Sequence, residues 1–411
     1  MTTRGRTIAA LAVVMVVFGR LGGMRELLMA GSALALTLLT GFVLVWMRGG
    51  RAKVKRRIFP TRTSVGGKAR IELGIEATGR IGIGPVLLSD RLPRVLGPTP
   101  RLALPGGRRN RQRAVAYTLA PRMRGRFTIG PLEITNTDPF GAVRRRVKVS
   151  GTSSLLVVPS YENISILPSG AQRIGVVRHS PLVGHGDEFY ALRQYEEGDD
   201  LRKVHWPTSA KTGELVIRQE ELLAEPRALI VLDTSEAKHK GTGPGASLEA
   251  AISACAAVGV HALKRRMRIE VITPDGPLLQ TRRPSEEQFL EDLALLKASK
   301  KVGIAHALKH ADRPRAGRPG LVVVISPGLR KDDLRAVALR MRGSVPGAFV
   351  EIDAASFEAK RSRQRSSSSF ELPGVPVVRL RSGDSFRAAW HTTIKEGPFG
   401  GPPHRDVALA R

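Results

Sequence analysis

Residues 228–233 read ALIVLD, an unbroken apolar run that ends in a carboxylate. Similar runs recur downstream at residues 268–273 (RIEVIT), 321–326 (LVVVIS), 348–353 (AFVEID) and 375–380 (VPVVRL). Strands that are apolar along most of their length are typical of a parallel sheet covered on both faces. The sequence therefore predicts an α/β domain with an open, doubly wound sheet over residues 225–395, followed by a disordered tail at 396–411.

Helical periodicity fills the gaps between these strands. One apolar face after the first strand is formed by Leu248, Ile252, Cys255, Val258 and Ala262. A second helix is expected after Ser285, a candidate N-cap with Gln288 three residues on, and a third helix at 334–341. In an open sheet of this kind, ligands bind at the carboxyl ends of the strands, which makes Asp233 a candidate site residue.

Short alternating strands broken by Gly and Pro precede this domain. Residues 68–75 (KARIELGI), 114–119 and 127–134 have the two-residue alternation of half-buried strands. Residues 101–113 (RLALPGGRRNRQR) interrupt them with a Gly-Gly turn and several arginines, as in a hairpin tip or a loop. We therefore expect a small β-sandwich over residues 51–165.

The start of the chain is strongly apolar. Residues 27–47 (LLMAGSALALTLLTGFVLVWM) carry no charge and are long enough for a transmembrane helix across about 30 Å of hydrocarbon. A shorter apolar run at 8–18 is either the core of a cleavable signal peptide or the first arm of a helical hairpin. We favour a transmembrane hairpin in residues 1–50, with helices at about 7–23 and 27–47, because no small-residue cleavage site follows Phe18.

The formal charge of +30 suits an anionic partner, either nucleic acid or a lipid surface. A basic cluster follows the second apolar segment and consists of Arg48, Arg51, Lys53, Lys55, Arg56 and Arg57. The positive-inside rule then predicts a multi-pass protein of the cell membrane with its C-terminal domains in the cytoplasm. The cluster also predicts contact with the anionic inner leaflet, where each basic residue contributes about 1 kcal/mol.

Residues 186–221 are the densest stretch of charged and aromatic side chains. They lie in a connecting region, 166–224, with little helical or strand periodicity. Charges so close to aromatic residues suggest an ion-paired network that locks two domains together, because a buried charge needs a partner. A recognition surface for another protein is the alternative.

Within this stretch the pattern G-D-E-F-x-x-L-R-x-Y-x-x-G-D-D-x-R-x-x-x-W-x-x-S-A (186–210) resembles the signature of the domain of unknown function 58 family. Two upstream segments, R-G-R-F-x-x-G-P-L (124–132) and D-P-F-G (138–141), match that family as well. The signature residues expected at a partner surface or domain junction are Gly186, Asp187, Phe189, Arg193, Tyr195, Gly198, Asp199, Asp200, Arg202, Trp206, Ser209 and Ala210. The resemblance implies a bacterial protein with a von Willebrand factor A-like C-terminal domain, associated with a MoxR-type AAA+ ATPase.

The resemblance also implies a possible Mg²⁺ site. Von Willebrand factor A domains often hold this ion through a D-x-S-x-S motif after the first strand, where carboxylate and hydroxyl oxygens are suitable ligands. Asp233 and Ser235 match the motif, whereas Ala237 replaces the second serine. A degenerate Mg²⁺ site is thus the one cofactor to consider, and a hydrogen-bonding role for Asp233 within its loop is the alternative. A metal-dependent hydrolase would add Asp199 and Asp200.

Common catalytic signatures are absent from the sequence: it contains no phosphate-binding P-loop, no H-E-x-x-H and no G-x-S-x-G. We therefore expect no enzyme and no catalytic residue. The favoured hypothesis is a membrane-anchored adaptor or scaffold that faces the cytoplasm and binds a MoxR-type AAA+ ATPase and its clients by protein–protein interaction. The alternative is a membrane-associated nucleic-acid-binding protein that uses the basic loops at 101–113, 122–126 and 144–148.

Overall fold

The computed structural model describes residues 1–47, 52–77, 86–105, 113–149, 151–168, 190–196, 201–220, 227–279, 281, 283–301, 303–305, 308, 319–340, 345–358 and 375–396. The chain divides into two compact units. The first unit consists of Met1–Tyr161, Gly241–Ala256 and Glu286–Ala298, and the second of Glu162–Lys240, Ala257–Ser285 and Ser299–Arg411. Residues 241–256 and 286–298 thus belong to the first unit, although the sequence predicted a single α/β domain over 225–395.

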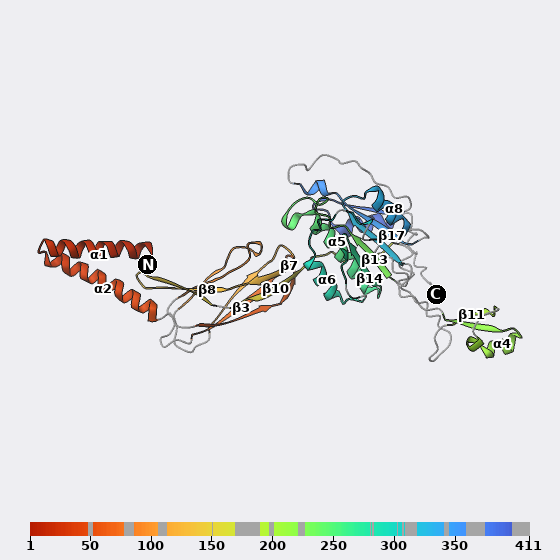
Figure 1. Ribbon diagram of the computed structural model, residues 1–411, viewed down its shortest axis with the longest axis horizontal. Helices are drawn as coiled ribbons and strands as arrows, with labels where there is room; N and C mark the ends of the chain where they lie inside the picture. Colours follow the sequence, from red (N-terminus) through yellow and green to blue (C-terminus); the bar gives the residue numbers. More distant parts are fainter. Residues whose placement is uncertain are drawn as a thin grey trace, which may run out of the picture. The chain divides into compact units, whose positions relative to one another are not determined.

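The chain begins with two antiparallel helices, α1 (Thr3–Leu21) and α2 (Arg25–Met47) (Figure 1). Glycines let their backbones approach closely: a Cβ on Gly19 would lie 2.7 Å from the amide nitrogen of Leu28. Among the described residues, α2 alone is long and apolar enough to cross a membrane. Helix α1 begins earlier than expected because Thr2 caps it, accepting a hydrogen bond from the amide of Gly5 at 3.1 Å.

Strands β1–β10 of the first unit form three small sheets. One contains β1 (Ala52–Phe59), β3 (Ala69–Ala77) and β6 (Arg113–Leu119); the second contains β2 (Arg62–Ser64), β10 (Ser153–Val158) and β7 (Gly125–Ile129); the third contains β5 (Arg101–Leu104), β4 (Val86–Asp90), β8 (Leu132–Thr137) and β9 (Arg144–Val149). All neighbouring strands are antiparallel except β2 and β10. A short turn, η1 (Arg94–Leu96), follows β4. The sheets together are sandwich-like, as the alternating pattern predicted.

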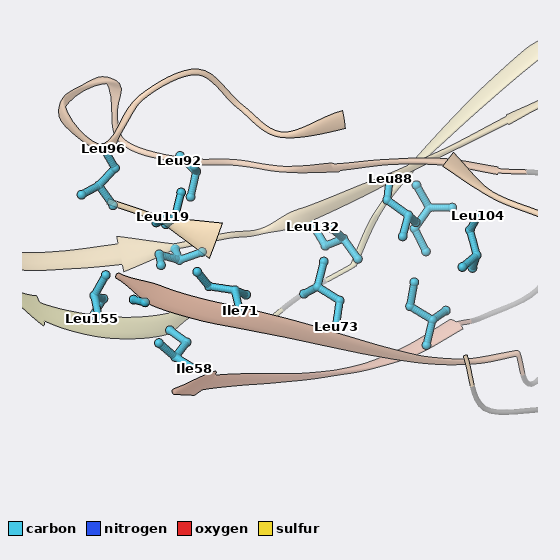
Figure 2. Close-up of a cluster of buried hydrophobic side chains, with 14 of the residues drawn as sticks. Ile58, Ile71, Leu73, Leu88, Leu92, Leu96, Leu104, Leu119, Leu132 and Leu155 are labelled. Atoms are coloured by element: carbon cyan, nitrogen blue, oxygen red, sulfur yellow. The ribbon is translucent and has the colours of Figure 1, made fainter. Parts of the chain in front are cut away.

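Leucine and isoleucine side chains from these sheets pack into one core (Figure 2). Alternate residues of β3, including Ile71 and Leu73, are fully buried. Leu88 of β4, Leu132 of β8 and Leu155 of β10 join them. The two-residue period therefore places one face of each strand in the core, where each buried leucine or isoleucine stabilises the fold by about 1.5–3 kcal/mol.

The prediction of a single strand over residues 127–134 is wrong. The structure contains two strands here, β7 and β8, which belong to different sheets. Gly130 and Pro131 separate them: Gly130 has a φ of +106°, which disfavours other residues, and Pro131 has no N–H to donate to a ladder. The apolar positions shift by one residue across this break, from Phe127 and Ile129 to Leu132 and Ile134, and both strands contribute to the same core.

A buried ion pair ties β1 to β4. The Arg56 guanidinium contacts the Asp90 carboxylate, with Nη2 to Oδ1 at 2.5 Å and Nε to Oδ2 at 3.2 Å. The hydroxyl of Tyr117, on β6, donates to Asp90 Oδ2 at 2.6 Å. The sequence predicted that Arg56 faces the lipid as part of the basic cluster. Its side chain is instead buried in the β-sandwich and paired with Asp90.

Helix α6 (Glu286–Leu295) and residues 247–256 of α5 (Ser247–Lys264) belong to the first unit with the sheets. Arg124, which precedes β7, joins them: its Nε and Nη2 donate to the carbonyl oxygens of Leu293 and Leu296 at 3.0 and 2.8 Å. Its Nη1 forms an ion pair with Glu249 of α5. The unpaired carbonyls at the end of α6 are thereby satisfied by a cation, which also suits the helix dipole.

The second unit contains a mostly parallel sheet, as predicted. Its strand order is β15-β14-β13-β16-β17-β18, and β15 alone is antiparallel. These strands are β13 (Arg227–Leu232), β14 (Arg268–Thr273), β15 (Gly276–Pro277), β16 (Leu321–Ser326), β17 (Gly347–Ile352) and β18 (Val377–Leu380). Every residue of β16 is buried, so both of its faces are covered.

Helices and short turns accompany the sheet. They are α8 (Lys331–Arg340), α9 (Phe386–Glu396) and η4 (Ala354–Phe357). The turn η3 (Gly243–Gly245) belongs to the first unit. Val337 of α8 packs in one core with Val322 and Val324 of β16. Helix α9 was not expected from the sequence; its Trp390 is fully buried and donates to the carbonyl of Ile166 at 2.9 Å.

The connecting region has more structure than its sequence indicated. Strands β11 (Tyr190–Gln194) and β12 (Val216–Glu220) form an antiparallel hairpin, and η2 (Leu201–Lys203) and α4 (Trp206–Thr212) lie between them in the chain. The His205 side chain caps α4 by accepting from the amide of Thr208. We call the described part of residues 190–220 the ββα element.

Candidate functional site

The candidate site lies at the carboxyl ends of β13 and β16. These strands are neighbours in the sheet, although two strands separate them in the sequence order. The chain leaves them in opposite lateral directions, toward β14 on one side and toward β17 on the other. Such a switch point in a parallel sheet is where ligands of α/β proteins bind.

Asp233 follows β13 directly, and its fully buried carboxylate is surrounded by donors. Oδ1 accepts from the hydroxyl of Ser235 at 2.5 Å and from its amide at 3.1 Å. Oδ2 accepts from the hydroxyl of Ser326, the last residue of β16, at 2.9 Å. The two residues expected from the sequence, Asp233 and Ser235, thus contact each other directly.

A lysine completes this arrangement. The Lys238 Nζ lies 2.7 Å from Asp233 Oδ2 and donates to the carbonyl of Gly328 at 3.0 Å. A second buried carboxylate, Asp333 of α8, lies 3.6 Å from the same ammonium. The Lys238 side chain is only 15% exposed, so the two carboxylates and the ammonium share one poorly hydrated site.

Asp333 is held by backbone amides. Its Oδ1 accepts from Ile304 and Ala305, both at 2.9 Å, and its Oδ2 accepts from the amide of Arg330 at 3.3 Å. Gly303, which precedes these donors, has a φ of +96°. The segment at 303–305 therefore has its amides fixed on the carboxylate by a glycine turn.

The electrostatics favour two charged carboxylates. Burial alone would raise the pKa of Asp233, but the hydrogen bonds from Lys238 and Ser235 hold that pKa below its ordinary value. Burial likewise opposes ionisation of Asp333, yet the amides of Ala305 and Ile304 keep its pKa low. His239 lies beside them, and burial lowers its pKa although its Nε2 is 2.7 Å from the carbonyl of Asp233.

These residues fit a bound Mg²⁺ poorly as they stand. A divalent ion at Asp233 would have to lie against the Lys238 ammonium, and two cations this close repel one another strongly at a buried site. Within the described ranges, no group of three His, Cys, Asp or Glu side chains has a geometry suited to a metal ion. Asp199 and Asp200, the further residues of a hydrolase, lie outside the described residues.

The family-signature residues are only partly described. Gly186, Asp187, Phe189, Gly198, Asp199 and Asp200 lie outside the described residues, as does the side chain of Arg193. Tyr195, Arg202, Trp206, Ser209 and Ala210 belong to the ββα element. Ser209 is structural: its buried hydroxyl accepts from the amide of Val216 at 2.9 Å. Trp206 is 65% exposed.

Sequence reasoning missed Lys238 and Asp333, which complete the site. Lys238 lies five residues after Asp233, and Asp333 is in the first turn of the helix that follows β16. A carboxylate after one strand and another after its sheet neighbour were visible in the sequence. The ammonium between them could be located only once the loop after β13 was folded.

Comparison with known proteins identifies one family. The family model described as "Protein of unknown function DUF58" matches residues 191–345, which confirms the resemblance to the domain of unknown function 58 family. "Uncharacterized protein YeaD" of Bacillus subtilis (strain 168) is 25% identical over 125 residues, which make up 30% of this chain and 31% of that protein. The match thus spans about a third of the length of this curated relative.

Similarities to solved structures are weak. The crystal structure of the CARDB domain of the PF1109 protein from Pyrococcus furiosus, in complex with di-metal ions, is 15% identical and covers 26% of this chain and 92% of that one, with a TM-score of 0.20. The alkylpurine DNA glycosylase AlkC of Pseudomonas fluorescens, bound to DNA, is 11% identical and covers 31% of this chain and 38% of that one, also with a TM-score of 0.20. Scores this low carry no inference about this protein.

Proposed function

Because residues 191–345 form a DUF58 domain, we propose that this chain is a membrane-anchored scaffold that presents this domain, including its ββα element, to protein partners on the cytoplasmic side. The observation that carries the proposal is helix α2, whose apolar side chains face outward. Leu36, Leu39 and Phe42 are all more than half exposed. Such a surface is unfavourable in water and is typical of a helix that contacts lipid.

Packing of the first helix supports a retained hairpin. Thr2, Gly5 and Ile8 of the α1 region contact the loop between β8 and β9. A cleaved signal peptide would remove these contacts from the folded protein. With both helices retained, the basic residues after α2 favour a multi-pass protein whose large C-terminal part is cytoplasmic.

The second unit serves, on this proposal, as a binding module rather than an enzyme. Its strand order, with one short antiparallel edge strand, supports a von Willebrand factor A-like domain. At the switch point, Lys238 supplies the positive charge that would otherwise have to come from a metal ion. We therefore assign the ion-paired cluster a role in fixing the loop after β13, the loop after β16 and the start of α8.

The partner surface that we propose is on the ββα element. Trp206 and Leu201 both expose more than half of their side chains, and Trp206 is one of the family-signature residues. Exposed tryptophans are frequent energetic centres of protein–protein interfaces. The resemblance to the domain of unknown function 58 family favours a MoxR-type AAA+ ATPase as the partner.

Co-purification tests this proposal. Full-length protein is used to capture the AAA+ ATPase under nucleotide-trapping conditions, with a Trp206→Ala variant and a Phe59→Ala control that removes an exposed aromatic of β1. We expect Trp206→Ala to weaken capture by about tenfold or more and Phe59→Ala to leave it unchanged. Failure of the wild-type protein to capture the ATPase would contradict the proposed partner.

The anchor is tested separately by carbonate extraction of membranes. We expect the intact protein to remain in the pellet. Recovery of the full-length chain in the supernatant would overturn the membrane part of the proposal, whatever the outcome of the capture experiment.

The nucleic-acid alternative is weaker on the described residues. Arg124, one of its candidate cations, has a side chain only 6% exposed and is paired with Glu249. Arg146 lies 3.5 Å from Glu133. Cations already paired within the protein release fewer counterions from a phosphate backbone, so they contribute little to binding.

A further inference from the structure

The loop between β8 and β9, residues 138–143, is organised by one buried aspartate. Asp138 Oδ1 accepts from the amide of Val143 at 2.6 Å, and Oδ2 accepts from the amide of Phe140 at 3.1 Å. Gly141 has a φ of +69°, a conformation that favours glycine. The Asp138 carboxylate is therefore used inside the turn, and the turn has a fixed shape.

This turn is bonded to the start of α1. The Thr2 hydroxyl donates to the carbonyls of Gly141 and Ala142 at 2.7 and 3.0 Å, and the Thr2 amide donates to Ala142 at 2.9 Å. Gly5 is required for this approach, because a Cβ there would overlap the Ala142 carbonyl oxygen. The amino end of α1 is thus rigidly attached to the β8–β9 hairpin.

The turn also packs on the carboxyl-terminal part of α2. A Cβ on Gly41 would lie 3.1 Å from Asp138 Oδ2, and Val45 forms a small buried cluster with Ala142 and Val143. Two aromatic side chains remain exposed at this end of the helices: Phe140 at 56% and Trp46 at 68%. Exposed aromatic residues at the end of an apolar helix are typical of the membrane interface.

A basic cavity of about 850 Å³ opens beside this attachment. It is lined by Met1, Thr2, Thr3, Arg4, Arg6, Thr137, Gly141, Arg144 and Arg146. The lining contains four guanidinium groups and no carboxylate. Arg146 is partly neutralised by Glu133 at 3.5 Å. Among the described residues, no acidic side chain forms an ion pair with Arg4, Arg6 or Arg144.

We propose that this cavity binds the phosphate of an anionic glycerophospholipid headgroup. Guanidinium groups match phosphate oxygens by paired hydrogen bonds, and the amino end of α1 adds the positive end of a helix dipole. The cavity lies where an apolar helix pair begins, so the acyl chains of the same lipid can continue along α1 and α2. This inference rests on the proposed membrane anchor, and it assigns a ligand to a defined site on it.

A lipid is favoured over a soluble phosphate compound by position. The neighbouring surface includes Phe140 and the outward apolar side chains of α1, such as Leu11 and Val14. A soluble anion would gain nothing from these side chains, whereas acyl chains would cover them. Basic pockets on the cytoplasmic side of transmembrane helices recognise anionic headgroups by this combination of charge and apolar surface.

The test is isothermal titration calorimetry, in which each probe is titrated into full-length protein in a neutral detergent. The probes are short-chain phosphatidylglycerol, short-chain phosphatidylcholine and inorganic phosphate. The pocket variant is Arg4→Gln/Arg6→Gln/Arg144→Gln, and the matched control, Arg91→Gln/Arg122→Gln/Arg126→Gln, removes the same charge from exposed positions of the β-sandwich. We expect phosphatidylglycerol to bind the wild-type and control proteins, and to bind the pocket variant about 100-fold more weakly, or about fivefold for each cation lost.

Three results would overturn the inference: equal weakening in the control, equal affinity for phosphatidylcholine, or saturation by inorganic phosphate at the same concentration. Vesicle flotation of the pocket variant separates this question from the anchor itself. A variant that floats with vesicles but has lost headgroup selectivity supports the site. A wild-type protein that fails to float would refute the proposed anchor without altering the calorimetric result.

Discussion

Asp90 in the first unit and Asp233 in the second are both fully buried carboxylates held by one cation and by hydroxyl groups. Asp90 is paired with Arg56 and Tyr117, all three from strands of the β-sandwich. Asp233 is paired with Lys238 from a loop, and a second carboxylate, Asp333, shares that lysine. The two carboxylates thus have similar partners in different places. Asp90 joins strands within the β-sandwich, whereas Asp233 lies at the carboxyl edge of a parallel sheet, the position at which α/β proteins in general bind ligands.

The two sites differ in how the cation contacts the carboxylate. Arg56 makes two contacts with its carboxylate, so the pair is complete in itself. Lys238 is a single ammonium between two carboxylates, and its contacts to them differ in length, at 2.7 and 3.6 Å. A point charge can be exchanged for another cation more readily than a planar fork can. We therefore expect substitutions at the two sites to differ in whether added ions rescue them.

The largest loss of folding stability is expected for Asp90→Ala. The change leaves the Arg56 charge and the Tyr117 hydroxyl buried without their partner, which costs about 3–5 kcal/mol. Amide hydrogen exchange in β1, β4 and β6 of the detergent-solubilised protein measures the loss. Asp275→Ala, which removes a surface carboxylate 3.6 Å from Lys301, is the control and should change exchange little. Unchanged exchange in Asp90→Ala would contradict the structural role of this pair.

Lys238→Met is expected to cause the next largest loss of stability, about 3 kcal/mol, because it removes the ammonium that both Asp233 and Asp333 contact. Millimolar Mg²⁺ should restore part of this loss in the variant and have no effect on the wild-type protein, because the variant lacks the ammonium that would repel the ion. Thermal unfolding followed by the fluorescence of buried Trp390 measures both. Lys240→Met changes an exposed lysine nearby and serves as control. Loss without any rescue by Mg²⁺ would contradict the idea that Lys238 stands in for a metal ion.

A smaller loss, about 2 kcal/mol, is expected for Arg124→Gln, which removes an ion pair and weakens the hydrogen bonds to the end of α6. Protection of the amides of α6 from hydrogen exchange should fall first. Arg126→Gln lies on the exposed side of β7 and should leave α6 unchanged. If both variants behave alike, Arg124 is not the residue that holds α6 to the sandwich.

The smallest effect concerns acid pH. Asp233 and Asp333 have pKa values below the ordinary 3.8, so their ionisation stabilises the folded protein above that pH. This stabilisation is lost as the pH falls through their folded pKa values. Ser235→Ala removes a hydrogen bond that lowers the pKa of Asp233, and the acid unfolding midpoint of the second unit should therefore move to higher pH. A midpoint that is unchanged, or that moves to lower pH, would show that Ser235 does not tune this carboxylate.

Much of the second unit was predictable because its signals are local. The runs at 268–273 and 321–326 coincide with β14 and β16. β16 has the clearest signal, because a strand covered on both faces is apolar along most of its length. Asp233 was a candidate for a local reason too, because it follows such a run directly, whereas Ser235 was expected only from the motif that the family resemblance implies. The apolar helix at 27–47 likewise agrees with α2 to within two residues at its start.

Contacts between distant segments were not predictable. Lys238 reaches Gly328, and Arg124 reaches Leu293, across long stretches of chain that no periodicity connects. The split between β7 and β8 was missed because apolar residues continue on both sides of Gly130 and Pro131, although the chain changes sheets there. The charged connecting region gave no periodic signal for the ββα element, since short strands and a helix of one or two turns carry too few residues to show one.

The cation at Asp233 is a side chain of the protein and not a bound ion. A cation tethered to the backbone cannot diffuse away, so its concentration at Asp233 is set by the loop after β13 and not by the surrounding solution. Chelating agents cannot strip it, and changes in the supply of divalent ions cannot switch it on or off. Any rearrangement of this cluster that frees the carboxylates therefore requires the loop after β13 to carry its lysine away from them.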